Sequence, residues 1–142
     1  MKNYFVGILS IVLIASCTDP KMQKVETLKT ECIAIHDEVM PRMSEIVEIS
    51  SGIKEMRAEL DTDTTDSAAL IRKNLVLQVE LLDSAHESMM VWMNEYVPDY
   101  DLDHDADQSI KFYEEQKVRI AEVKELMLKS IEDGKNTLEK ME

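Results

Sequence analysis

The apolar residues that follow Val25 return at alternating steps of three and four, with one step missing near Ser50. They are Val25, Leu28, Cys32, Ile35, Val39, Met43, Ile46, Ile53, Met56 and Leu60. This spacing places them on one stripe of a helix, as in the seam of a coiled coil. Only three glycines and three prolines occur in 142 residues. The pattern therefore predicts a mostly helical chain.

Two polar segments divide the rest of the chain into further helices. "DTDTTDS" at 61–67 and "PDYDLDHDAD" at 98–107 are rich in turn and capping residues. We expect helices at about 20–60, 66–97 and 105–140 within one domain, 17–142. Short connections make neighbouring helices antiparallel. The predicted fold is all-α, an elongated up-down-up three-helix bundle with coiled-coil-like packing.

The same periodicity predicts the inward faces of the later helices. On the second helix we expect inward positions at Leu70, Leu75, Val79, Leu82, Ala85 or His86, Met89 and Met93. On the third helix we expect them at Ile110, Tyr113, Ile120, Val123, Met127, Ile131 and Leu138.

Several residues predict where the helices begin, bend and end. Asp19 can cap the first helix with Pro20 at its first position, and Asp105 with Gln108 predicts a capping box for the third. Pro41 removes one helical hydrogen bond, but the apolar phase continues past it, so we expect a kink and not a reversal. We expect Gly134 to end the third helix or to fray its last turn.

The first sixteen residues have the form of a secretory signal peptide, with a lysine near the start and an apolar run too short to cross a bilayer. The following "IASC", residues 14–17, resembles the lipobox of bacterial lipoproteins. This resemblance implies cleavage of 1–16 and acylation of Cys17. Two or three acyl chains hold a protein stably on a membrane. We therefore expect a membrane partner through the lipid anchor.

Charge limits the other partners. The chain carries 16 basic and 29 acidic side chains, a net charge of −13. Loss of Lys2 with the signal leaves 15 basic residues and a net charge of −14. Such a chain is repelled by nucleic acid, so we expect no nucleic-acid partner. Lipidation of Cys17 leaves Cys32 without an internal disulfide partner, and we expect it to be a small core residue, with an intermolecular disulfide as the alternative.

Two stretches resemble each other, "HDEVMPRM" at 36–43 and "HESMMVWM" at 86–93. If the first two helices fold back about Asp63, His36 lies opposite Met90 and Met40 lies opposite His86, at one height of the bundle. Imidazole and thioether groups together suit soft ions such as Cu(I). The candidate metal ligands are His36, Met40, His86, Met89, Met90 and Met93.

Two other interpretations of these residues remain open. Methionine fills gaps in cores, and a core seam produces the same spacing, which makes a filled core the favoured interpretation. A small-molecule or peptide groove with Trp92 at its edge is the third. We expect no cofactor, with copper as the alternative.

No pattern in the chain indicates catalysis. Ser44, Ser84 and Ser88 lack a nucleophile elbow or glycine-rich oxyanion loop. The segment 103–114 spaces acids like a calcium loop, but it has Gln108 where glycine is needed, and Asp105 is expected to cap a helix. We expect the protein not to be an enzyme.

The lipobox, "HDEVMPRM", "MMVWM" at 89–93 and "FYEEQKVRI" at 112–120 together resemble a group of uncharacterised small helical lipoproteins of Bacteroidota, some labelled "viral A-type inclusion protein". The resemblance implies an all-helical protein of the cell envelope and supplies no activity. Only one acid closely follows Cys17, which favours the outer membrane facing the periplasm. We expect a non-catalytic binding role, with a second copy or another envelope protein as partner.

Overall fold

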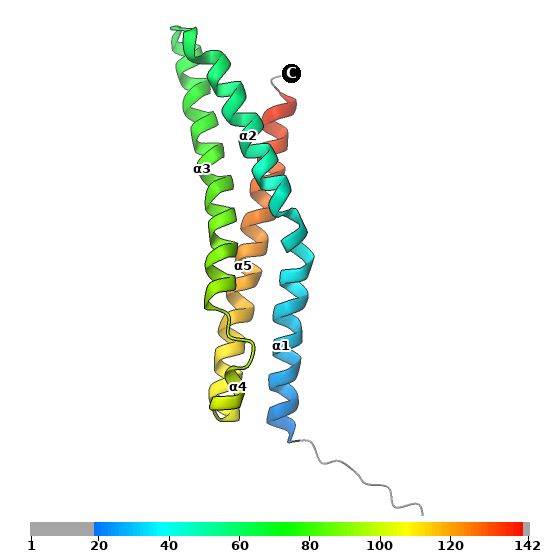
Figure 1. Cartoon of the computed structure of the whole chain (residues 1–142). Coiled ribbons are helices and arrows are strands. Elements are labelled where there is room, and N and C mark those ends of the chain that lie inside the picture. Colours follow the sequence, from blue (N-terminus) through cyan, green and yellow to red (C-terminus); the bar gives the residue numbers. More distant parts are fainter. Residues whose placement is uncertain (1–18, 141–142) are drawn as a thin grey trace, which may run out of the picture.

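The computed structural model describes residues 19–140, and these residues are helical with no strand among them. The elements are α1 (Pro20–Val39), η1 (Met40–Arg42), α2 (Met43–Glu59), η2 (Leu60–Thr62), α3 (Asp66–Glu95), α4 (Tyr100–Asp103) and α5 (Ala106–Glu139). Figure 1 shows long helices packed lengthwise, with α1 and α2 forming one continuous rod. The predicted all-helical class is confirmed. The signal peptide and Cys17 lie outside the described residues.

Side-chain contacts define how the helices run past one another. Ion pairs join Lys24 to Glu114 at 2.6 Å, Glu31 to Lys117 at 2.8 Å and Glu38 to Lys124 at 2.6 Å, so residue numbers rise together along α1 and α5. The rod formed by α1 and α2 therefore runs in the same direction as α5. Such exposed pairs add little stability individually, but they mark the register.

α3 runs in the opposite direction to both of its neighbours. The Ser50 hydroxyl donates to Asp83 at 2.9 Å across α2 and α3, while the Trp92 indole donates to the backbone oxygen of Gln116 at 3.2 Å across α3 and α5. Near the middle of α3, the Ser130 hydroxyl donates to the backbone oxygen of Leu81 at 3.4 Å. Here residue numbers fall on one helix as they rise on the other.

The predicted helix starts are confirmed. The Asp19 carboxylate accepts a hydrogen bond from the Lys21 amide at 2.9 Å, with Pro20 in the first turn. Asp105 and Gln108 form a reciprocal capping box, in which each side chain accepts from the other residue's backbone N–H. These caps satisfy amides that have no partner inside the helix.

Pro41 changes the helix type without reversing the chain. Residues Met40–Arg42 form a single 3-10 turn between α1 and α2, and the rod bends there in Figure 1. Proline has no N–H to donate to the preceding turn, so the chain winds more tightly at this point. Val39 and Met43 on either side remain in the core, which confirms the predicted kink.

The hydrophobic core between the three long helices consists of a large cluster and a smaller one formed by Val25, Leu28 and Tyr113. Its largest fully buried side chains include Ile46, Ile53, Leu75, Leu82, Met89, Ile120 and Met127. Cys32 is also fully buried, as predicted, and burial raises the pKa of its thiol to about 11. A thiol in this position is not available for an intermolecular disulfide.

Two predicted positions are wrong. Leu70 was expected inward but is 63% exposed, because Ala68, seven residues before Leu75, takes the core position. Gly134 neither ends nor frays α5, which continues to Glu139. A Cβ at Gly134 would lie 2.6 Å from the Ile49 Cγ2, so its role is to let α2 approach α5 closely.

The connection between α3 and α5 contains a short helix, α4, that the sequence pattern did not predict. The Tyr113 hydroxyl lies within hydrogen-bond distance of the backbone oxygen of Pro98, 2.8 Å, and of the Asp101 carboxylate, 2.9 Å. The same carboxylate accepts from Lys29 at 2.8 Å. Asp101 thus joins the connection to α1 through Lys29 and to α5 through Tyr113.

Candidate functional site

The two similar stretches, 36–43 and 86–93, contact each other through an aromatic stack. The His36 ring lies on Trp92 with centroids 5.6 Å apart and planes 27° apart. The Trp92 ring also stacks with Tyr96, at 4.8 Å and 24°. Trp92 is only 2% exposed. It is thus a core residue of α3, and it also lines a groove between α3 and α5.

The two histidines lie at different levels. His86 lines a shallow groove with Ile46, Val47, Ser50 and other residues of α2, after the Pro41 bend. His36 contacts Trp92, which is six residues beyond His86 in α3, or about 9 Å along the axis. The expectation that Met40 lies opposite His86 therefore does not hold. The segment of α2 that faces His86 lies further along the chain, at Ile46, Val47 and Ser50.

The predicted methionines divide between the core and the surface. Met89 is fully buried. Met40 and Met93 are partly buried and pack against the core cluster. Met90 is 45% exposed. A helix turns by about 100° per residue, so neighbouring Met89 and Met90 cannot point to the same place. The six predicted ligands thus form no single cluster.

Five of the six predicted ligands nevertheless belong to one surface, together with Ile33 and Val47. We call this surface the methionine face, and its members are Ile33, His36, Met40, Val47, His86, Met90 and Met93. The members on the rod of α1, η1 and α2 are spaced by three, four and seven residues, and those on α3 by four and three, so each set shares one side of the rod or helix. His36 contacts α3 and His86 lines a groove with α2. Both sets therefore border the line where α3 meets the rod formed by α1 and α2.

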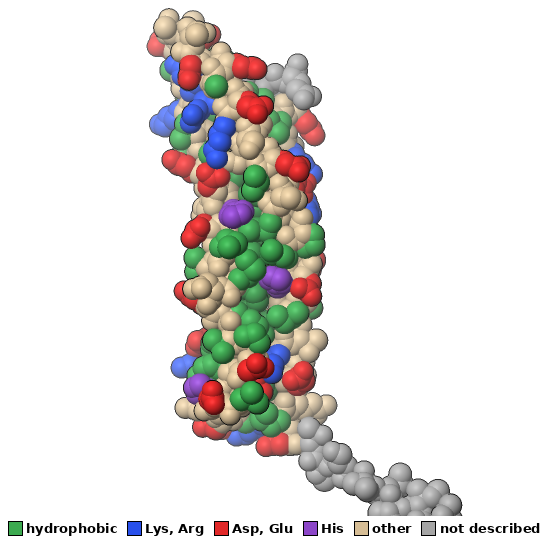
Figure 2. Space-filling model, in the orientation of Figure 1, with side chains coloured by type: hydrophobic (Ala, Val, Ile, Leu, Met, Phe, Trp, Pro, Cys, Tyr) green, Lys and Arg blue, Asp and Glu red, His purple; other side chains and the backbone are tan. Residues whose placement is uncertain are grey.

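Figure 2 shows this side of the molecule. Hydrophobic side chains gather along its middle, with histidines among them, and charged side chains lie mostly at the margins and towards the ends. Ile33 and Val47 are 40% and 51% exposed, so the apolar groups are accessible and not merely the edge of the core. Contiguous exposed apolar surface with a polar margin is typical of a binding site.

Several charged groups next to this face are held in ion pairs, although Glu87, which lines the groove with His86, is in none among residues 19–140. Lys54 pairs with Asp83 at 3.3 Å near His86, and Lys29 pairs with Asp101 at 2.8 Å beyond His36. The Asp37 carboxylate lies 2.9 Å from the His36 Nδ1. The hydrogen bond from Lys29 holds the pKa of Asp101 below its usual range. The middle of the face therefore presents thioether, aliphatic and imidazole groups.

Two members of the face were missed by the sequence interpretation. Ile33 and Val47 lie off the main seam, so the spacing of the core residues does not predict them. The signal was present: Ile33, Met40 and Val47 recur every seven residues, which marks a second stripe beside the core.

Residues 19–140 contain no group of three or more His, Cys, Asp and Glu side chains that could hold a metal ion. A metal at the methionine face would therefore need thioether ligands, as the Cu(I) hypothesis requires. No helix within the described part of the chain is long and apolar enough to cross a membrane.

Comparison with known proteins gives no relative: no family model, no curated protein and no solved structure matches this chain.

Proposed function

We propose that this protein is a membrane-anchored envelope lipoprotein with a non-catalytic binding role, and that the methionine face binds another envelope protein. The observation that carries the proposal is the exposed apolar surface between α3 and the rod formed by α1 and α2, with charged side chains mostly at its margins. Burial of apolar area is the main favourable term in most protein association.

The chemistry of the face suits a protein partner. Methionine side chains are unbranched and polarisable, so Met40, Met90 and Met93 can adapt to an apolar surface of varied shape. The partly exposed His36 ring adds a flat group that can contact apolar or polar atoms. The proposed ligand is therefore the apolar side of another folded protein and not a small polar metabolite.

Charge favours a different protein over a second copy. Each mature chain would carry a net charge of −14, and acids stand at the margin of the face, so two copies that meet here bring like charges together. A partner with basic residues around an apolar patch avoids this cost. Light scattering separates the two cases, since self-association through the face gives twice the monomer mass.

The anchor supports the envelope assignment. The lipobox-like "IASC" ends at Cys17, and α1 begins three residues later at Pro20. The bundle would thus stand close to the bilayer, which we propose is the outer membrane on its periplasmic side. Metabolic labelling with a fatty acid tests this part: label on the protein that persists in a Cys17→Ser variant contradicts it.

Site-specific photo-crosslinking in the native envelope tests the binding surface. A crosslinker at Met90 is expected to capture one defined protein. The matched control is a crosslinker at Val118, which is apolar, 58% exposed and on α5. Capture of the same protein in equal yield from both positions contradicts the proposal.

Soft-metal binding is the second candidate function, and one observation favours it: His36, Met40, His86, Met90 and Met93 all lie on the methionine face. Cu(I) titration of the purified protein tests it. Binding that is lost in a His86→Ala, Met90→Ala double variant supports a copper site. Equal binding by the variant and the unmodified protein contradicts it.

A further inference from the structure

α3 carries a second apolar stripe that the core and the methionine face do not use. Leu70, Leu77, Leu81 and Val91 are all at least 38% exposed. With Ser84 and Ser88 between them they are spaced by seven, four, three, four and three residues, so they lie along one side of the helix. From Leu70 to Val91 the stripe is about 32 Å long.

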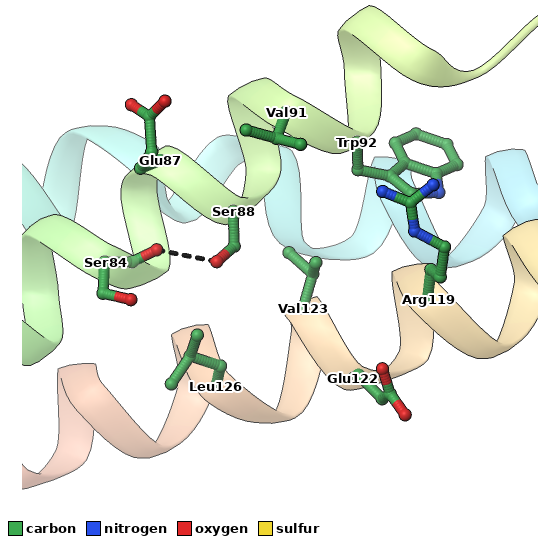
Figure 3. A pocket seen from close by; sticks show the side chains of 9 residues that line it. All are labelled: Ser84, Glu87, Ser88, Val91, Trp92, Arg119, Glu122, Val123 and Leu126. Carbon is green, nitrogen blue, oxygen red and sulfur yellow. Dashed lines mark hydrogen bonds between the residues drawn. The ribbon is translucent and has the colours of Figure 1, made fainter.

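Part of this stripe forms one wall of a groove between α3 and α5. The groove has a volume of about 420 Å³. It is lined by Ser84, Glu87, Ser88, Val91, Trp92, Arg119, Glu122, Val123 and Leu126. In Figure 3, Val123 and Leu126 rise from α5 towards the serines of α3, and the Trp92 ring lies beside Arg119 at one end.

The two serines make a notch in the stripe. They have small side chains where the neighbouring turns carry Leu81 and Val91. The Ser88 hydroxyl donates to the backbone oxygen of Ser84 at 2.8 Å, so its hydrogen is already used inside α3 (Figure 3). The Ser88 hydroxyl would therefore keep its hydrogen bond when an apolar side chain enters the notch, so this donor is not buried without a partner.

The groove has a negative margin. Arg119 is neutralised by an ion pair with Glu95. Glu87 and Glu122, one on each wall, take part in no ion pair among residues 19–140. The accessible charge on both sides of the apolar floor is thus carboxylate.

We propose that the groove between α3 and α5 binds an amphipathic helix of another protein, with bulky apolar residues along one face and Lys or Arg on both flanks. The groove together with the apolar stripe that continues from it along α3 matches helix-in-groove recognition, in which side chains at successive turns contact an apolar surface. One large side chain enters the notch at Ser84 and Ser88. The basic flanks lie next to Glu87 and Glu122.

This inference goes beyond the proposed function, because the groove and the methionine face occupy different sides of α3. Ser84, Ser88 and Val91 belong to the groove, while His86, Met90 and Met93 belong to the face. A chain with both surfaces can hold two proteins at once beside the membrane.

Two synthetic helices of about 20 residues test the groove. Both carry the same leucine face; one has lysine flanks and the other glutamate flanks. The emission of Trp92, the only tryptophan of the chain, reports binding to the purified protein. The lysine helix is expected to bind at least about tenfold more tightly, and to weaken as salt rises from about 0.05 to 0.5 M.

Variants locate the binding. Leu81→Glu and Ser88→Phe, checked for helix content, are each expected to weaken the lysine helix about tenfold or more, whereas Met90→Glu and Val118→Glu leave it unchanged. Equal affinity for both helices, or equal loss with Val118→Glu, overturns the inference. Failure of the lysine helix to bind overturns it too, and leaves the methionine face to its own test. If the unmodified protein is a dimer that Leu81→Glu converts to a monomer, the occupant is a second copy and the inference is wrong.

Discussion

The imidazole of His36 stacks on the indole of Trp92, with ring centroids 5.6 Å apart, and this contact joins two similar stretches that lie fifty residues apart in the chain. The indole is fixed from the other side by Tyr96 and by a hydrogen bond to the backbone oxygen of Gln116. α1, α3 and α5 therefore meet at one tryptophan, which is buried in the core and borders both proposed binding surfaces.

The stack is expected to contribute to stability. His36→Ala should lower the free energy of unfolding by about 0.5–1.5 kcal/mol, the usual range for a stacked aromatic pair. Urea unfolding followed by Trp92 emission measures it. His86→Ala is the matched control, since His86 is partly exposed and makes no stack, and it should change stability less. An equal loss in both variants would show that the ring contact has no special role.

The two glycines inside α2 and α5 should respond oppositely to alanine. At Gly134 the new Cβ meets the branched Ile49 at 2.6 Å, so Gly134→Ala should cost about 1–3 kcal/mol by overpacking. At Gly52 the nearest atom is the Leu138 Cδ2 at 3.4 Å, in a side chain that can move. Gly52→Ala should be neutral or stabilising by up to about 1 kcal/mol. Thermal unfolding of both variants checks this, and a stable Gly134→Ala protein would contradict the close approach of α2 to α5.

Asp101 should make stability depend on acid pH. The hydrogen bond from Lys29, and then that from Tyr113, hold the pKa of this carboxyl below its usual range. Its contribution is therefore complete above the pKa of an unfolded aspartate, about 3.9, and is lost as pH falls through the lower folded pKa. Asp101→Asn should cost about 1.5–3 kcal/mol at pH 7, as for hydrogen bonds to a charged group.

The difference between the unmodified protein and Asp101→Asn should shrink as the pH falls below about 4. Asp107→Asn is the control, because Asp107 pairs with Lys21 on the exposed surface and should matter little. A difference for Asp101→Asn that stays constant down to pH 2 would rule out the charged hydrogen bonds as its source.

Cys32 should be unreactive in the folded protein. It is fully buried, and burial raises the pKa of its thiol to about 11, so little thiolate exists at pH 8. A thiol reagent added to a Cys17→Ser variant should react with Cys32 only at the rate of unfolding, and at once in denaturant. Fast reaction of the folded protein would contradict the packing of α1 against α5.

Sequence periodicity predicted the helices well because most core positions are apolar and evenly spaced. It failed where a core position is not a large apolar residue. Gln116 takes the step between Tyr113 and Ile120 although it is polar, and Ala68 takes the step where Leu70 was expected. Gly134 was expected near a helix end because a sequence shows no inter-helix distance.

The candidate site was predicted in part. The two stretches identified the surface, since five of the six proposed ligands lie on the methionine face. The levels of the two stretches along the bundle differ from the predicted ones, because η1 inserts a tighter turn at Pro41 and the reversal at 60–65 is longer than a simple fold at Asp63. Trp92 was expected at an edge, but the indole is large enough to fill the core and still reach the groove between α3 and α5.

The central claim is that the methionine face is a binding surface, and the affinity for the protein captured from Met90 tests it most directly. The dissociation constant is measured for the unmodified chain, for Met90→Glu and for Val118→Glu, two variants that each add one carboxylate at an exposed apolar position. A carboxylate buried without a partner costs several kcal/mol. The account predicts at least about a hundredfold weaker binding for Met90→Glu and no change for Val118→Glu. Equal affinity for all three proteins would contradict it.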